Sequence, residues 1–108
     1  YHRMRASGKS WRERRFLVSL DYGLCTGNTE DTGREVVVQG VCDFVFEEDG
    51  ELVIVDYKTD RVRCMQELSE RYGRQLLIYR KAMEKMTGKP VKECILYSIP
   101  RGEELSLS

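Results

Sequence analysis

The dipeptide Asp49-Gly50, which stands between two apolar runs, is the feature that most restricts the fold. An Asp-Gly pair favours a two-residue hairpin turn, because both central positions of such a turn need positive φ angles. The run before it, Glu35 to Phe46, is dense in Val and Phe, and Leu52 to Val55 follows it. The sequence therefore predicts two antiparallel strands joined by this turn.

The other elements are predicted from periodicity and from breaker residues. Leu52 to Val55 is apolar at every position, which predicts a central strand covered on both faces. From Met65 to Met86 apolar residues recur at three- and four-residue spacing, as in a helix, and Gly88 and Pro90 are typical of a helix end. Gly23 to Gly33 has the composition of a loop. Further strands are predicted at Arg15–Leu20, Val91–Ile99 and Glu103–Leu107.

The predicted element order is β-β-β-α-β-β. This order describes an α/β (α+β) fold, a mixed β-sheet with one long helix packed on it. A chain of 108 residues is long enough for one small domain and not for two. We therefore expect a single domain over residues 1–108.

The formal net charge is zero, so the chain as a whole does not attract nucleic acid. Any binding of nucleic acid must come from local basic patches. Basic residues gather in two stretches, and each stretch could equally be an ordinary solvated face. The first comprises Arg3, Arg5, Lys9, Arg12, Arg14 and Arg15, and the second comprises Arg61, Arg63, Arg71, Arg74, Arg80, Lys81 and Lys85.

The four cysteines form no Cys-x-x-Cys pair, and their spacing fits neither a zinc site nor an iron–sulfur site. Cys42 and Cys94 lie in strand-like runs, which predicts small buried apolar residues. No run approaches the ~20 apolar residues that span a bilayer, and no secretory signal is visible, so we expect a cytoplasmic protein. The chain opens at Tyr1 without Met, which indicates a fragment of a longer protein.

The predicted hairpin brings two carboxylates together. Its register places Asp43 opposite Asp56 on one face, where Cβ atoms are ~4.5–5.5 Å apart and like charges repel. A divalent cation would offset that repulsion, because hard oxygen ligands suit Mg²⁺ or Mn²⁺. Two alternatives remain: one Asp is protonated, or a bulge shifts the register and moves one carboxylate to the other face.

Three more side chains belong to the candidate site. Lys58 lies two residues after Asp56, hence on the same face of the strand, where its ammonium could orient a water or stabilise charge on a phosphate. It could instead be a simple ion-pair partner of Asp56. Gln75 and Tyr79 are four residues apart and share one helical face. Gln75 could reach the site or could be an ordinary residue at the edge of the apolar stripe.

Three segments form a combination that is more specific than a lone Asp-x-Lys. They are Gly40-Val41-Cys42-Asp43, then Asp56-Tyr57-Lys58-Thr59-Asp60, then Tyr72-Gly73-Arg74-Gln75 with Tyr79. Together they resemble the nuclease domain of bacterial AddAB- and RecBCD-type helicase–nuclease complexes, most closely that of the AddA subunit. Glu13 resembles a Glu that precedes the first strand's Phe in that family. The likeness extends from about Trp11 to the end of the chain.

The resemblance implies a restriction-endonuclease-like core and Mg²⁺-dependent exonuclease cleavage of DNA, within an ATP-dependent helicase/nuclease acting in double-strand break repair and recombination. It implies Asp43, Asp56 and the backbone carbonyl of Tyr57 as metal ligands and Lys58 as the catalytic lysine. Gln75 and Tyr79 would support the site. The basic stretches would hold the DNA backbone, with Arg12, Arg14, Arg61, Arg63 and Arg74 as the candidates. The implied partner is a second, AddB-like subunit.

The chain departs from the family in two respects. Family members carry a His ligand on an upstream helix, whereas the only His here is His2, at a position that does not match. No G-x-x-x-x-G-K-[ST] motif occurs, so ATP would be bound only by the parent protein. We therefore expect weak metal binding and weak or absent cleavage by this chain alone.

Two other interpretations compete with this one. A nuclease-fold module that binds DNA or a partner subunit without cutting would have no need to keep Asp43, Asp56 and Lys58. CRISPR-associated exonucleases of related fold hold an iron–sulfur cluster through clustered cysteines, which this chain does not supply.

Overall fold

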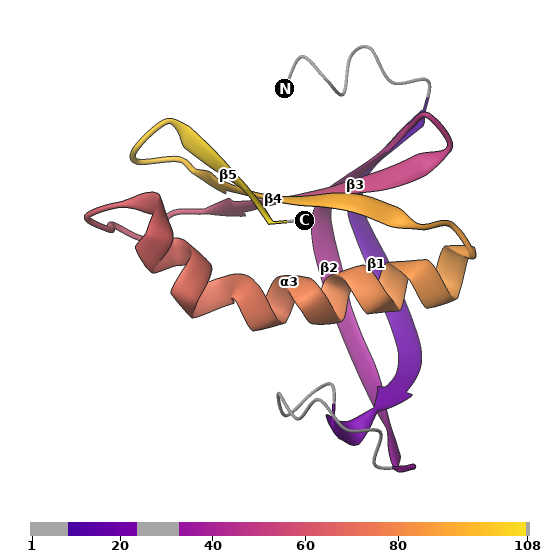
Figure 1. The fold of residues 1–108 in the computed structure, drawn as a ribbon. Coiled ribbons are helices and arrows are strands. Elements are labelled where there is room, and N and C mark those ends of the chain that lie inside the picture. Colours follow the sequence, from indigo (N-terminus) through magenta and orange to yellow (C-terminus); the bar gives the residue numbers. More distant parts are fainter. Residues whose placement is uncertain (1–8, 24–32, 108) are drawn as a thin grey trace.

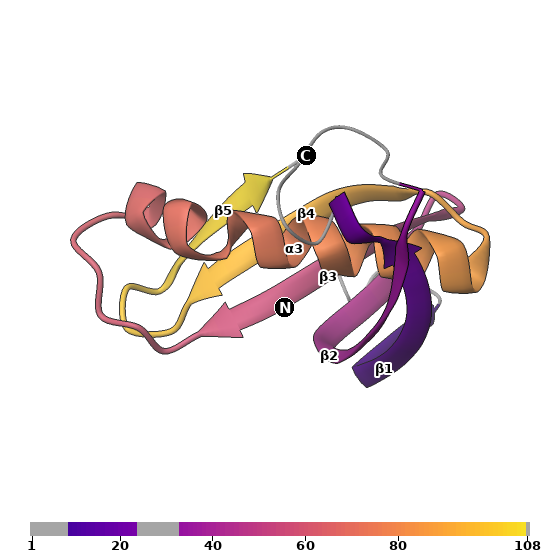
Figure 2. The ribbon, with the colours of Figure 1, turned by 90° about the horizontal axis from the view of Figure 1, so that it is seen from below.

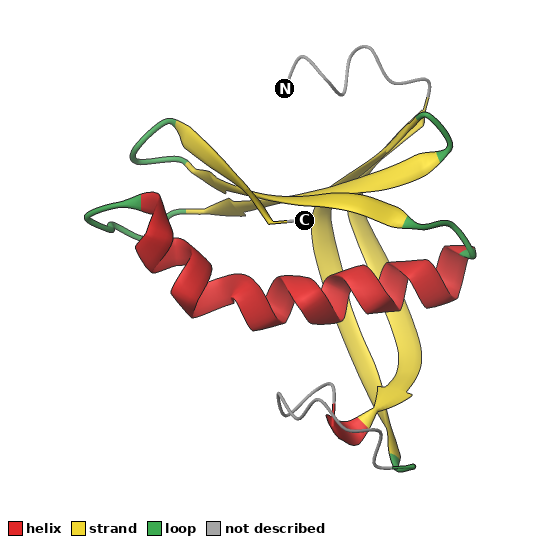
Figure 3. Ribbon diagram, in the orientation of Figure 1, coloured by secondary structure: helices red, strands yellow, loops and turns green. Residues whose placement is uncertain are grey.

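A computed structural model of the chain describes residues 9–23 and 33–107. Within these residues, five strands form one sheet in the order β1-β2-β3-β4-β5, and helix α3 lies along one face of it (Figures 1 and 3). The elements are β1 (Lys9–Asp21), β2 (Glu35–Glu48), β3 (Glu51–Lys58), α3 (Met65–Thr87), β4 (Val91–Ser98) and β5 (Glu103–Leu107). The predicted order and the mixed sheet with a long helix are confirmed. No helix in the described part has the length and apolar character to cross a lipid bilayer.

The predicted hairpin turn is confirmed. Asp49 and Gly50 have φ angles of 56° and 79°, so both central positions are positive, and Glu48 pairs with Glu51. From there the β2–β3 ladder runs in the predicted register. A two-residue turn with this backbone twist matches the twist of the flanking strands, which fixes the pairing of every residue that follows.

Strand β1 is longer than predicted. It begins at Lys9 rather than Arg15, because its first half pairs with β2 from Lys9↔Glu47 to Arg12↔Phe44. The polar residues of this half carry no strand periodicity, so the partner strand rather than the local sequence makes it extended. β1 and β2 continue past α3 as a two-stranded arm (Figure 1). Most of the loop predicted between residues 23 and 33 lies outside the described residues.

Strand β3 occupies the centre of the sheet. It pairs antiparallel with β2 and parallel with β4, and the connection to β4 passes through α3. The side chains of Leu52 to Val55 are at most 1% exposed, so both faces of the strand are covered, as predicted. The alternation of a strand places Asp56 and Lys58 on the same side as Leu52 and Ile54, which is the side that faces α3.

Two apolar clusters lie on the two faces of the sheet. The helix-facing cluster consists of Phe16, Leu20, Cys42, Val45, Leu52, Ile54, Leu68, Leu76, Ala82, Met83, Val91, Cys94 and Leu96. The smaller cluster consists of Phe46, Val53, Val55 and Ile95, with Phe44 and Tyr57 against it. Cys42 and Cys94 are therefore buried apolar residues, as predicted, and burial raises the pKa of their thiols to about 12 and about 11.

Helix α3 ends where the sequence predicts. Gly88 adopts a left-handed φ of 73° and its N–H donates to the Glu84 carbonyl at 2.9 Å, which caps the helix. Figure 2 shows the helix running from the β4–β5 end of the sheet towards β1 and β2. At that far end the Lys85 ammonium donates to the carbonyl of Ser19 in β1. The helix thus connects the two ends of the sheet.

Gly40→Ala is expected to destabilise the fold by about 1–3 kcal/mol. A Cβ at Gly40 would lie 2.7 Å from Cζ of Phe16, and that ring is buried and packs edge-on against Tyr79 at 5.3 Å. Moving the ring therefore disturbs Tyr79 as well. Urea denaturation measures the loss. The double variant Gly40→Ala with Phe16→Leu should recover part of it, and a purely additive double variant would contradict the proposed clash.

Candidate active site

The pairing of β1 with β2 is irregular at Asp43. The ladder omits Glu13 and Asp43, and Glu13 has a positive φ of 49°, which is uncommon for a residue with a side chain. Cys42 and Val45 both belong to the helix-facing cluster, although a regular strand would point them to opposite faces. Strand β2 therefore changes its orientation at Asp43.

This irregularity alters how the two acidic residues meet. The β2–β3 ladder ends at Phe44↔Val55, so Asp43 and Asp56 do not form the directly opposed backbone pair that the register predicts. Instead, Oδ2 of Asp43 accepts the backbone N–H of Tyr57 at 2.8 Å. The side chain of Asp43 thus takes the place of a main-chain acceptor and lies across the end of the ladder. The two carboxyl groups are still in contact, because the side chains of Asp43 and Asp56 share a hydrogen bond.

Asp56 is a buried acid in an unfavourable environment. Its residue is 4% exposed, and its Oδ2 has no hydrogen-bond partner within residues 9–23 and 33–107. Lys58 Nζ lies 2.9 Å from that oxygen, an ion pair whose angles are not those of a hydrogen bond. Burial, followed by a hydrogen bond with the Asp43 side chain, raises the pKa of Asp56 to about 6 against the opposing effect of Lys58. The carboxylate therefore has unfilled capacity for a cation.

Lys58 is held on several sides. Besides the contact with Asp56, its Nζ donates to Oε1 of Gln75 at 2.9 Å and lies 3.9 Å from the ring centroid of Tyr72. Its side chain is 15% exposed. Gln75 is therefore not an ordinary residue at the edge of the apolar stripe, because its side chain reaches the carboxylate–lysine pair from α3.

Tyr79 lies on the helix-facing side near the same group. Burial and then the charge of Asp56 raise the pKa of its hydroxyl, which places Tyr79 within electrostatic reach of the site. Its ring packs against Phe16. A catalytic part for Tyr79 stays a prediction.

The predicted DNA-binding arginines lie on three parts of the fold, namely β1, the segment between β3 and α3, and α3. Arg12 lies over the ring of Phe44 at 5.2 Å and lines a hollow of about 520 Å³ together with Glu13, Asp43, Phe44 and Tyr57. Arg14 lies over Trp11 at 5.8 Å. The three others are exposed, two in the segment between β3 and α3 and one on α3: Arg61, Arg63 and Arg74.

The donor set fits a hard divalent cation. Asp43 and Asp56 supply carboxylate oxygens, one of them buried without a hydrogen-bond partner. Mg²⁺ is commonly held by one or two carboxylates and keeps several waters, so two carboxylates suffice for it. In the described segments no third His, Cys, Asp or Glu completes a cluster of three. His2 lies outside the described residues.

Tyr72 and Asp60 belong to the motif segments of the sequence, but no part in the site was predicted for either. Yet Tyr72 precedes Gln75 by three residues, so the two share one helical face, and its hydroxyl donates to Oδ2 of Asp60 at 2.7 Å. The three-residue spacing from Gln75 was the sequence signal that could have placed Tyr72 next to the site.

Asp56→Asn is expected to stabilise the metal-free protein by about 1–3 kcal/mol at pH 8, as the raised pKa indicates. Asn keeps the shape of the protonated carboxyl and carries no charge to bury. Because the folded pKa lies above the unfolded value, the favourable contribution of the Asp56 proton is complete below pH ~4 and is lost as the pH rises through about 6. The gain from Asn should therefore be large at pH 8 and small at pH 4.

Urea denaturation in EDTA at the two pH values measures this effect. Asp49→Asn, in the exposed turn, is the matched control and should change stability little at either pH. A variant less stable than the parent protein at pH 8 would show that the ion pair with Lys58 outweighs the cost of burial.

Comparison with known proteins agrees with this geometry. Residues 1–105 match the PD-(D/E)XK nuclease superfamily, and Asp56-Tyr57-Lys58 has the (D/E)XK form that this name prints. The chain belongs to this superfamily of nucleases, and its mixed sheet with one packed helix is consistent with the family's fold. Nucleases of this superfamily generally use divalent metals.

Individual relatives point to one kind of nuclease polypeptide. The A subunit of the ATP-dependent helicase/nuclease of Clostridium kluyveri is 45% identical over 74 residues, 68% of this chain and 6% of the relative. The corresponding A subunits of Alkaliphilus oremlandii and Geobacillus kaustophilus are 39% and 38% identical over 88% and 93% of this chain, and 8% and 9% of the relatives. The resemblance to helicase–nuclease subunits is confirmed, and the chain spans less than a tenth of these relatives.

Proposed function

We propose that this chain is the catalytic core of a DNA exonuclease that depends on Mg²⁺ or Mn²⁺. In this proposal Asp43 and Asp56 hold the cation with the backbone carbonyl of Tyr57, and Lys58 is the catalytic lysine. Gln75 and Tyr79 support them.

The observation that carries the proposal is the state of Asp56. A buried carboxylate with an oxygen that lacks a hydrogen-bond partner, beside a second carboxylate, is costly for a metal-free fold. A cation between the two carboxylates would remove that cost. A fold with no need of a cation would gain stability by replacing Asp56, which favours a metal site here.

The chemistry divides among the chain's own groups. A bound divalent cation would supply a water of lowered pKa and neutralise charge on a phosphodiester. Lys58, whose Nζ contacts Asp56 and Gln75, would orient that water and would stabilise negative charge as it develops on a phosphate oxygen. The N–H of Tyr57 holds Asp43 in position through the 2.8 Å hydrogen bond.

The wider function belongs to the complete protein. The relatives are named as the A subunits of ATP-dependent helicase/nucleases, and we propose that this chain is the nuclease core of such a protein, acting on DNA in double-strand break repair and recombination. A second, AddB-like subunit would be its partner, and ATP would be bound elsewhere in the complete polypeptide. Arg12, Arg14, Arg61, Arg63 and Arg74 would contact the DNA backbone without reading sequence.

Calorimetric titration of Mn²⁺ tests the proposed metal site. This chain should bind Mn²⁺ weakly and saturably, because in the described segments it offers two carboxylates only. Asp56→Asn should abolish binding, since the buried oxygen ligand is lost. Asp49→Asn should bind as the parent chain does.

The same titration on the complete polypeptide distinguishes a weak site from a wrong one. Tighter binding there would mean that further ligands lie outside the described residues. Equal binding by Asp56→Asn and the parent, in both proteins, would contradict the proposed site.

A further inference from the structure

The third contact of Lys58 has no part in the proposed metal site. Asp56 and Gln75 hold the ammonium through oxygen atoms, whereas Tyr72 presents the face of its ring, with Nζ 3.9 Å from the centroid. A cation that close to a ring centroid is attracted by the negative face of the ring. The ring therefore limits where the ammonium can move.

Tyr72 is itself held in place. Its hydroxyl donates to Oδ2 of Asp60 at 2.7 Å, and the same oxygen accepts from Nη1 of Arg71 at 3.1 Å. Asp60 follows Lys58 by two residues. The ring face and the hydroxyl of Tyr72 therefore contact side chains from one short segment, Lys58 to Asp60. The ring cannot turn away from Lys58 without breaking the hydrogen bond to Asp60.

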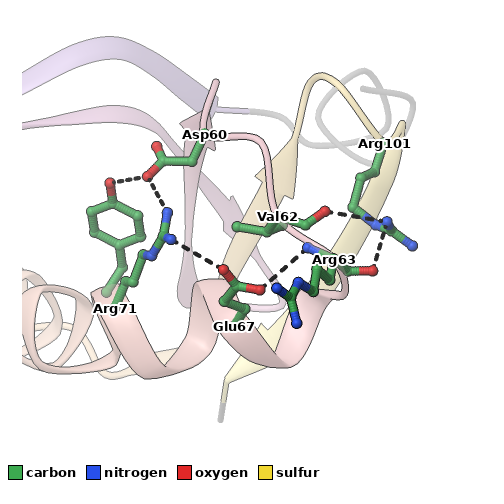
Figure 4. Close-up of polar contacts among 7 residues, drawn as sticks. Asp60, Val62, Arg63, Glu67, Arg71 and Arg101 are labelled. Atoms are coloured by element: carbon green, nitrogen blue, oxygen red, sulfur yellow. Dashed lines mark hydrogen bonds and ion pairs between the residues drawn. The ribbon is translucent and has the colours of Figure 1, made fainter.

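The contacts continue into the segment between β3 and α3 (Figure 4). Nη2 of Arg71 lies 3.1 Å from Oε1 of Glu67, and the other carboxylate oxygen of Glu67 accepts the backbone N–H of Arg63 at 3.2 Å. Nη1 of Arg101, which follows β4, donates to the carbonyl of Arg63 at 3.0 Å. Side chains from α3 and from the β4–β5 connection thus hold the segment that leaves β3 after Lys58.

We propose that Tyr72 is a positioning residue for Lys58, and that Asp60 and Arg71 fix Tyr72. The ring face keeps the ammonium beside Asp56 and Gln75 and prevents it from swinging into solvent. This inference rests on the proposed catalytic part of Lys58, and it adds a residue that acts through that lysine rather than on the substrate.

The first test is the rate of DNA cleavage by the complete protein with Mg²⁺. Tyr72→Leu removes the ring and should lower kcat about tenfold with KM little changed, the size expected from a partly buried cation–π contact. Tyr72→Phe keeps the ring and loses only the hydroxyl, so it should restore most of the rate. Tyr22→Leu is the matched control, because Arg34 lies over that ring at 4.8 Å, just beyond the ends of β1 and β2 and outside the proposed site.

The second test observes Lys58 directly, without catalysis. Acetic anhydride labels lysine amines according to their access, and mass spectrometry gives the extent at each lysine. With the ring removed, Lys58 should be labelled several times faster in Tyr72→Leu, and near the parent rate in Tyr72→Phe. Labelling of Lys81 and Lys85, which are exposed on α3, should not change.

The outcomes are separable. Two results would overturn the proposal: unchanged labelling of Lys58 in Tyr72→Leu, or an unchanged kcat in Tyr72→Leu while Lys58→Met lowers kcat. Faster labelling of Lys81 and Lys85 together with Lys58 would mean that the loss of Tyr72 loosens the whole fold. That result would also overturn the proposal. If the parent protein does not cleave DNA, the nuclease mechanism fails, and the labelling still decides whether Tyr72 holds Lys58.

Discussion

Asp56→Asn is expected to lower the rate of DNA cleavage by the complete protein about a thousandfold, the scale on which loss of a metal or of an electrostatic stabiliser acts. Asn offers one neutral oxygen in place of a carboxylate, and the charge that attracts the cation is lost. The residue is 4% exposed, so no water-filled space replaces the ligand. Release of nucleotides from a labelled duplex with Mg²⁺ measures the rate.

The matched control is Asp49→Asn, which should cleave at the parent rate. Addition of EDTA should lower the cleavage rate of the parent protein to that of Asp56→Asn. Asp56→Asn should therefore lower the cleavage rate and raise the stability of the metal-free protein at pH 8. A residue with only a structural role would lower both when it is replaced. An Asp56→Asn protein that cleaves within tenfold of the parent would contradict the assignment.

Lys58→Met is expected to lower kcat about a hundredfold and to leave Mn²⁺ binding measurable. Met keeps most of the length of the side chain and removes the ammonium that would stabilise charge on the phosphate. Asp56 and Asp43 remain, so the cation is still bound, and removal of the positive charge even leaves the carboxylates more attractive to it. Cleavage assays and calorimetry on the same preparation measure the two effects.

Lys81→Met provides the control, because Lys81 is an exposed lysine of α3 that forms an ion pair with Glu84 at 3.8 Å. It should change neither quantity. Loss of Mn²⁺ binding in Lys58→Met would mean that the lysine organises the carboxylates and does not act in catalysis.

The fold was largely predictable because its signals are local. The Asp49-Gly50 turn fixes a hairpin by its own backbone requirements, and Gly88 ends α3 by adopting a conformation that other residues resist. The start of β1 at Lys9 was not predictable, because that half of the strand is defined by its pairing with β2. In the polar residues at the start of β1, no apolar alternation indicates that the segment pairs with a distant strand.

The residues of the candidate site were predicted more accurately than the way in which their side chains are arranged. Alternation along β3 correctly places Asp56 and Lys58 on one face, and their 2.9 Å contact follows from it. The ladder stops at Phe44↔Val55, so the predicted backbone pair of Asp43 and Asp56 is not formed, whereas the predicted contact between their side chains is. A positive φ at Glu13 accompanies the change in the orientation of β2 at Asp43, and a glutamate gives no warning of it in sequence.

The parallel pairing of β3 with β4 implies an order of assembly for the site. The two carboxylates lie on one hairpin, whose strands meet by closing a short stretch of chain, whereas Lys58 is fixed by residues of α3, which must first form and dock. Local contacts close early in folding and distant ones late, because closing a longer loop costs more chain entropy. We expect the acidic pair to come together before its lysine is locked in place. Until α3 docks, the two carboxylates would lie together without the ammonium that opposes their charge, and a proton or a cation from solution would have to reduce the repulsion between them.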